Sequence, residues 1–265
     1  KLVDYPGGDW FIFDDLNKIF MSAKAEIFVE AFGGSCWSSL NVSRAKFKVI
    51  ICNDIDQDLI TLYKLVKEKP EEVIKRLAIL PFSRELHKIA YEIINDKTVD
   101  SITRAVMLFY AIRASFFGNP LHGFKVSKTA NETKRYVNTI ALMTEYAKKL
   151  RDVVLECKDY KDIIKLYDSE RTLFYLDPPY VGHDHYRYNF TLSDLKTMTN
   201  VLKSVKGFWV LKISEDNYNL IKNLLPNHEI TELKTFLSMK KVEGGEEKPE
   251  YKYIIAHNFK IPKLI

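Results

Sequence analysis

Short apolar runs that each end on an acidic or glycine-rich segment constrain the fold of this chain most strongly. The run at 27–29 leads into "EAFGG", and the run at 49–52 leads into "NDID". After the second run, apolar residues recur at helical spacing between Leu59 and Val66. This order of strand, helix, strand and helix predicts a parallel sheet within an α/β fold.

Three further runs extend this pattern beyond the middle of the chain. "VVLECKDY" at 153–160, "LFYLDPPY" at 173–180 and "GFWVLKIS" at 207–214 each predict a strand. In the second of these, Asp177 is followed by two prolines, which lack the N–H that a sheet needs and therefore end the strand. The residues after 229 predict a terminal antiparallel hairpin around Gly244 and Gly245.

The segment between these two groups of strands differs in character. Its pattern is mainly helical, as "SITRAVMLFYAIRASFFG" at 101–118 illustrates. Between residues 84 and 151, Lys and Arg outnumber Asp and Glu by twelve to six, although the whole chain carries only +5. We therefore expect a catalytic domain formed by 1–65 and 150–265, and a basic helical insert at 66–149.

Composition narrows the remaining classes of protein. With 265 residues, 46% of them hydrophobic, the chain can bury a sizeable core, and no apolar run is long enough to span a bilayer. No signal peptide is evident. The cysteines at 36, 52 and 157 form no CxxC and no evident pairs, which argues against a disulfide framework or a zinc site and favours the cytoplasm. "HDH" at 183–185 has no further ligands nearby, so we expect a loop over the site rather than a metal centre.

The acids at the strand ends predict a ligand site. Parallel sheets bind ligands beyond the carboxyl ends of their strands, where Glu30, Asp54 and Asp177 are expected. Asp54 follows Gly34 by 20 residues, a separation that lets a carboxylate bind ribose hydroxyls. The chain has neither GxGxxG nor a lysine-bearing phosphate loop. These features favour a nucleoside ligand without phosphates over NAD or ATP.

Several of these motifs, in this order, resemble the S-adenosylmethionine-dependent adenine-amino DNA methyltransferases, the Dam-like family. The resemblance rests on "VEAFGGS", "NDID" and "LDPPY", supported by "YPGG" at 5–8, "CKDY" at 157–160, "YNFTLSDL" at 188–195 and "YKYIIAHNF" at 251–259. It covers most of the chain. The insert lies where that family carries its target recognition domain. Asp4 and Asp9, however, occupy positions of the N-terminal motif at which the family usually has lysines.

The resemblance implies a Rossmann-like methyltransferase sheet, S-adenosylmethionine as the cofactor, double-stranded DNA as the substrate and no metal. The implied catalytic residues are Asp177, Pro178, Pro179 and Tyr180. The implied cofactor-binding residues are Tyr5, Gly7, Gly8, Asp9, Glu30, Phe32, Gly33, Gly34, Asp54, Ile55, Asp159, Tyr160 and Asp177. The implied DNA-binding residues are Arg113, Lys125, Lys128, Lys134 and Arg135.

In methyl transfer to an adenine amino group, the two prolines after Asp177 would have a chemical role. An adenine amino group is a poor nucleophile, because its lone pair is delocalised into the ring. The Asp177 carboxylate and the Pro178 carbonyl can each accept one N–H and direct the lone pair toward the methyl carbon, while proline rigidity fixes that carbonyl. Tyr180 offers a face on which a flipped base can stack.

Four alternatives remain open from the sequence alone. The chain could methylate the amino group of cytosine in DNA, or act on RNA or on a protein amide, or it could be a decayed, non-catalytic DNA-binding module. No cysteine follows a proline, which argues against cytosine-5 methylation. We expect a monomer without membrane contact, and a cognate restriction endonuclease is a further partner compatible with this interpretation.

Overall fold

The computed structural model describes residues 1–4, 8–182, 187–236 and 250–261. Tyr5 and Gly7, which we predict to bind the cofactor, lie outside this range, as do "HDH" at 183–185 and the turn at Gly244 and Gly245. No helix in the described ranges combines the length and apolar character needed to cross a bilayer.

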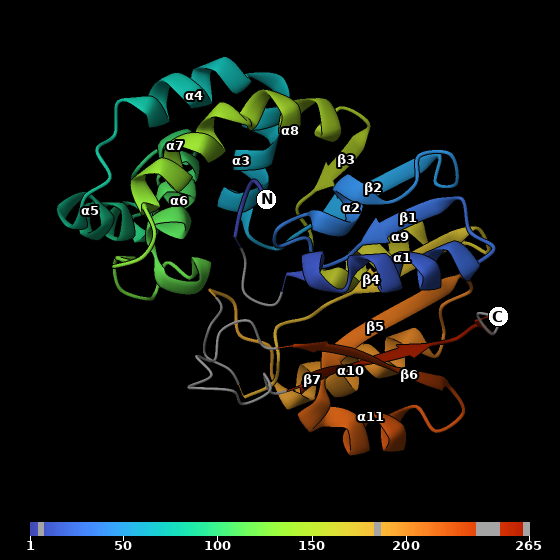
Figure 1. Cartoon of the computed structure of the whole chain (residues 1–265). Coiled ribbons are helices and arrows are strands. Elements are labelled where there is room, and N and C mark those ends of the chain that lie inside the picture. The colour runs from blue at the N-terminus through green and yellow to red at the C-terminus, as the bar shows by residue number, and fades with distance from the viewer. Residues whose placement is uncertain (5–7, 183–186, 237–249, 262–265) are drawn as a thin grey trace.

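The centre of the molecule is a seven-stranded sheet in the order β3-β2-β1-β4-β5-β7-β6 (Figure 1). Its first five strands are parallel, and β7 runs antiparallel to both β5 and β6. This confirms the predicted α/β fold and its terminal antiparallel pair. The strands are β1 (Ile27–Glu30), β2 (Val49–Asn53), β3 (Val153–Glu156), β4 (Thr172–Leu176), β5 (Phe208–Ser214), β6 (Glu229–Phe236) and β7 (Glu250–His257).

Alternating side chains of the strands form two separate cores, one on each face of the sheet. Phe28 and Tyr175 point into the core that includes α1 (Phe13–Ser22), α2 (Trp37–Asn41) and α3 (Gln57–Glu68). Their neighbours Val29 and Phe174 point into the opposite core, which is covered by helices from later in the chain. Those helices are α9 (Tyr160–Tyr167), α10 (Leu192–Leu202) and α11 (Tyr218–Leu224).

The middle of the chain is helical, as its pattern predicts, and it gathers beside the β3 edge of the sheet (Figure 1). Helix α3 connects this helical region to the sheet, because it packs against α6 and α8 and also against β3. The apolar residues that predict α3 are fully buried. The helices of this region are α4 (Pro70–Ala78), α5 (Arg84–Asn95), α6 (Ser101–Ala114), α7 (Glu132–Ala141) and α8 (Met143–Leu150).

Parallel pairing sets the location of the site. Glu30 lies opposite Cys52 and Tyr175 in the register, so the residues that follow β1, β2 and β4 emerge at one edge of the sheet. The glycine loop, Asp54 and Asp177 therefore meet there, as the sequence predicts.

Candidate active site

The glycine loop after β1 is held tightly against the end of β2. The Gly33 N–H donates to the Asn53 carbonyl at 2.6 Å. A Cβ at Gly33 would lie 2.7 Å from Cys52 Sγ and 2.9 Å from that same carbonyl oxygen, so a larger residue would push the loop away. The Tyr63 hydroxyl donates to the Gly34 carbonyl at 2.5 Å. The loop is thus fixed before any ligand arrives.

Asp54 connects the loop to the start of α3. Its Oδ2 accepts from the Gly34 N–H at 2.8 Å, and its Oδ1 accepts from the Asp56 N–H at 2.8 Å. Burial raises the pKa of Asp54 to about 6, although these backbone donors oppose the shift. The carboxylate is therefore held in one orientation and is largely ionised near neutral pH.

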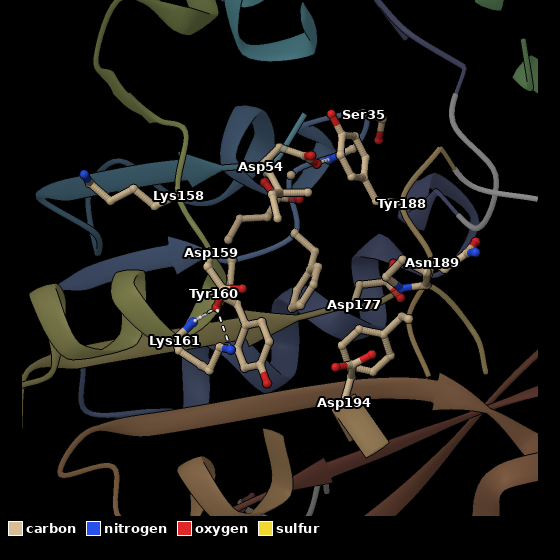
Figure 2. Close-up of a pocket in the computed structure, with 18 of the residues that line it drawn as sticks. Ser35, Asp54, Lys158, Asp159, Tyr160, Lys161, Asp177, Tyr188, Asn189 and Asp194 are labelled. Carbon is tan, nitrogen blue, oxygen red and sulfur yellow. Dashed lines mark hydrogen bonds and ion pairs between the residues drawn. The ribbon is translucent and has the colours of Figure 1, made fainter. Parts of the chain in front are cut away.

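One pocket brings the predicted cofactor residues together. It contains about 1090 Å³ of empty space, part of which is open to solvent. Figure 2 shows Asp54, Tyr160 and Asp177 around it, although they follow three different strands. Every predicted cofactor-binding residue in the described ranges lines this pocket: Gly8, Asp9, Glu30, Phe32, Gly33, Gly34, Asp54, Ile55, Asp159, Tyr160 and Asp177. Of the predicted catalytic residues, Asp177 and Pro179 line it, whereas Pro178 and Tyr180 do not.

Three aromatic rings form one wall of the pocket. Phe32 and Tyr160 are stacked, with centroids 5.5 Å apart and planes at 29°. Phe190 meets Phe32 edge to face at 5.9 Å. Burial raises the pKa of Tyr160 to about 12, so its hydroxyl stays neutral. Such a wall suits a flat heterocyclic base.

Glu30 lines the pocket, but its carboxylate faces the protein. One oxygen accepts from the Ser38 N–H at 3.3 Å and the other from the Ser39 N–H at 2.7 Å, both in the first turn of α2. Burial raises its pKa to about 8. Glu30 therefore fixes α2 behind the glycine loop, and direct contact with a cofactor remains a prediction.

Asp177 belongs to a buried group of charges. Lys212 on β5, fully buried, lies 2.8 Å from Asp177 Oδ2 and 2.5 Å from Asp9 Oδ1. Burial raises the pKa of Asp177 to about 7, with Lys212 lowering it and Asp9 raising it. The sequence analysis missed Lys212, although a single charged residue inside the apolar run "FWVLKIS" is a usable signal.

The segment after the two prolines is tied to α3 by Arg187, a second residue that the sequence analysis missed. Its guanidinium donates to Asp56 at 2.7 Å and to Asp58 at 3.2 Å. Tyr188, Asn189 and Phe190 follow directly and line the pocket. Lys158, Lys161, Ser35 and Asp194 are further lining residues that carried no prediction.

The cysteines correct one expectation. Cys36 and Cys52 form a disulfide, with Cα atoms 6.3 Å apart, whereas the sequence analysis expected no pair. The glycine loop folds back over β2 and brings these residues together, which their separation of 16 positions does not reveal. Cys157 is free and exposed. The Glu30 carboxylate lies within 4.8 Å of both sulfurs, but sulfurs that are joined in a disulfide do not act as thiolate ligands for a metal.

Three of the predicted DNA-binding residues form ion pairs. Arg113 pairs with Asp4 at 2.5 Å, and both Lys125 and Arg135 pair with Glu132. Lys128 and Lys134 are exposed, and no ion pair to them occurs within the described ranges. These two residues are therefore the most available cations of the predicted set.

The charged residues that line the pocket indicate which kind of cofactor it can bind. The lining carries the acids Asp9, Glu30, Asp54, Asp159, Asp177 and Asp194 against only two lysines. This excess of acids disfavours phosphates and suits a cationic nucleoside, with the aromatic wall for the base and Asp54 for the ribose. The mostly parallel sheet, with such a pocket at its carboxyl edge, therefore fits S-adenosylmethionine, the cofactor that the sequence resemblance implies.

Comparisons with known proteins identify the family. The model of the D12 class N6 adenine-specific DNA methyltransferases matches residues 5–239, and the chain belongs to this family. It is therefore an adenine-specific DNA methyltransferase that uses S-adenosylmethionine, which confirms the resemblance seen in the sequence.

The individual relatives share low sequence identity with this chain, but the matches cover most of its length. A DNA adenine methylase of Salmonella typhimurium is 24% identical over 92% of this chain and 86% of its own length. A DNA adenine methylase of Salmonella typhi is 26% identical over 85% and 79%, respectively. The type II methyltransferase M.MjaIII of Methanocaldococcus jannaschii is 24% identical over 63% of both chains.

Proposed function

We propose that Asp177 and the Pro178 carbonyl accept the two N–H bonds of a flipped adenine and so direct its amino lone pair toward the methyl donor. The position of Asp177 supports this assignment, because it follows β4 directly and lines the pocket beside Pro179. The pKa of about 7 means that a substantial fraction of Asp177 is ionised at neutral pH. Its role is orientation and stabilisation of the positive charge that develops on the amine.

The opposite part of the pocket would hold S-adenosylmethionine, which supplies an electrophilic methyl group. Phe32 and Tyr160 would stack on its adenine, and Asp54 would accept from the ribose hydroxyls. Gly34 would permit close approach of the ligand to the backbone, because it presents no side chain, whereas the missing Cβ of Gly33 lets the loop pack against β2. Asp159 lies on the same lining and would add negative charge near the sulfonium, whereas the Asp9 carboxylate is paired with Lys212.

The helical region between β2 and β3 would carry target recognition. Its excess of basic residues, and the exposed Lys128 and Lys134 in particular, supports contact with DNA phosphates. We further propose that residues 66–149 act as the recognition domain of a monomeric, cytoplasmic enzyme. A cognate restriction endonuclease would be a functional partner rather than a bound subunit.

Methyl transfer from labelled S-adenosylmethionine to DNA, followed by nucleoside analysis, tests this proposal. N6-methyladenine is the expected product, whereas N4-methylcytosine or labelled RNA would assign a different substrate. Asp177→Ala should lower turnover by about 10²–10³-fold while cofactor binding persists. Asp177→Asn should retain part of the activity, since its amide oxygen still accepts one hydrogen bond. Near-normal turnover of Asp177→Ala would contradict the assigned mechanism.

A further inference from the structure

A lysine is fully buried in the sheet directly beneath the proposed catalytic carboxylate. Lys212 lies near the middle of β5, and its Nζ is 2.8 Å from Asp177 Oδ2 and 2.5 Å from Asp9 Oδ1. Asp9 and Asp177 are far apart in the sequence, and each forms an ion pair with this ammonium group. Such a charge is retained in a protein interior only when it is well paired.

The surroundings of this cluster fix each member. The second oxygen of Asp9 accepts from the Tyr175 hydroxyl at 2.9 Å and from the Ser38 hydroxyl at 3.1 Å. The ring of Tyr253 on β7 lies 4.8 Å from Lys212 Nζ, and Tyr180 also interacts electrostatically with the lysine. The groups that face Asp177 are therefore one cation, one carboxylate and neutral phenols.

The arrangement explains an unusual position in the N-terminal motif. Asp9 stands where the family usually has a lysine, yet the cluster does contain one lysine, supplied by β5 instead. A lysine at position 9 together with Lys212 would place two ammonium groups beside Asp177. An acid at position 9 is the counterpart that allows a buried cation on β5.

We propose that Lys212 is a positioning residue for Asp177, holding Oδ2 so that Oδ1 accepts from the substrate amino group, and that Asp9 anchors this lysine. The inference rests on the proposed role of Asp177. The ammonium also keeps Asp177 ionised, because an adjacent cation favours the charged form of a carboxyl group. Asp9 acts in the opposite sense, since a second negative charge nearby disfavours ionisation of Asp177.

Because Lys212 and Asp9 influence the ionisation of Asp177 in opposite directions, the pH dependence of activity distinguishes a positioning role from a purely structural one. The measurement is single-turnover methylation of DNA as a function of pH, with saturating cofactor. Lys212→Met should move the acidic limb of the profile upward by about 1–3 pH units, and Asp9→Asn should move it downward. The residual activity of Asp177→Asn should show no such limb, because the titrating group is gone.

Two double variants test whether a loss of activity in the single variants results from misfolding. Asp9→Asn combined with Lys212→Met removes both charges, so its limb should lie between those of the single variants. Asp9→Lys combined with Lys212→Ser moves the cation to the usual position of the family and should be more active than Lys212→Ser alone. Thermal unfolding and calorimetry with S-adenosylmethionine identify which variants fold.

The outcomes separate this inference from the proposed function. Folded variants whose acidic limbs all coincide with that of the wild type would overturn the role of Lys212. A limb that persists in Asp177→Asn would also overturn it, because another group would then be titrating. A wild-type protein that methylates no adenine, or a fully active Asp177→Ala variant, would instead refute the proposed function itself.

Discussion

Replacing Arg187 by methionine should destabilise the protein and disorder one wall of the pocket. Arg187 bridges Asp56 and Asp58, and its side chain is 12% exposed, whereas those of the two acids are 2% and 3% exposed. Asp58 retains a second partner in Arg104 on α6, at 3.0 Å. Asp56 has no other cationic partner within the described ranges, so the substitution leaves its carboxylate buried and uncompensated.

The expected loss of stability in Arg187→Met follows from the buried, unpaired charge of the Asp56 carboxylate. Removing one partner of a buried ion pair typically costs about 3–5 kcal/mol, and the slight exposure of Arg187 places the expected loss near 3 kcal/mol. Burial already raises the pKa of Asp56, and Arg187 opposes that shift. Without the arginine, the pKa of the folded state rises further above that of the unfolded chain. The loss should therefore be largest above the folded pKa and shrink as acid protonates Asp56.

Urea denaturation at pH 7.5 and pH 5 measures this difference. Arg187→Met should be destabilised more at the higher pH than at the lower one, relative to the wild type at each pH. Asp56→Asn is the matched control, because the amide oxygen can still accept the α3 capping bonds of Asp58 and Leu59 without carrying charge. In the double variant, the cost of Arg187→Met should fall and lose its pH dependence.

Two results would refute this reasoning. A destabilisation of Arg187→Met that is equal at both pH values would show that lost packing, not a stranded charge, is responsible. Unchanged affinity for S-adenosylmethionine would show that Tyr188, Asn189 and Phe190 keep their places in the pocket without the bridge. Both outcomes are distinguishable from global unfolding by circular dichroism.

The remaining predictions concern the cofactor site and the DNA surface. Asp54→Asn should weaken cofactor binding by about 10–100-fold, the equivalent of one charge-assisted hydrogen bond, while DNA affinity measured by anisotropy stays constant. Replacing Lys128 and Lys134 with glutamine should reduce the slope of log affinity against log salt by about 2, whereas the same change at Lys196 on α10 and at Lys203 directly after it should leave the slope unaltered. Asp4→Lys should lower stability by about 1–2 kcal/mol in thermal unfolding, because Arg113 would lose its partner and face a second cation; a stabilised variant would contradict this.

The sequence predicts those parts of the site that consist of motifs directly following a strand. A strand must end at Asp177 because two prolines follow, and parallel pairing then places Asp54 and the glycine loop beside it. The glycine loop, Asp54 and Asp177 therefore line the same pocket.

The parts that the sequence does not predict depend on contacts between distant segments. Lys212 and Asp9 are 203 positions apart, and Arg187 and Asp56 are 131 apart. No periodicity connects such residues, and only the packed fold shows which charges neutralise one another. The same limitation applies to Asp4, whose partner Arg113 lies 109 positions away, so a charge that is isolated in the sequence is paired in the structure.

The distribution of charge over the molecule explains how one enzyme can handle both a polyanion and a cationic cofactor. The pocket lining is acidic, although burial raises the pKa of Glu30 to about 8 and so leaves that group mostly neutral at pH 7. The excess of basic residues lies instead in the helical region between β2 and β3. If the helical region contacts DNA as proposed, phosphates would be attracted to the helices and repelled from the pocket, whereas an uncharged base could enter it. An extruded adenine, and not its phosphate backbone, would then reach Asp177, which agrees with the proposed methylation of a flipped base.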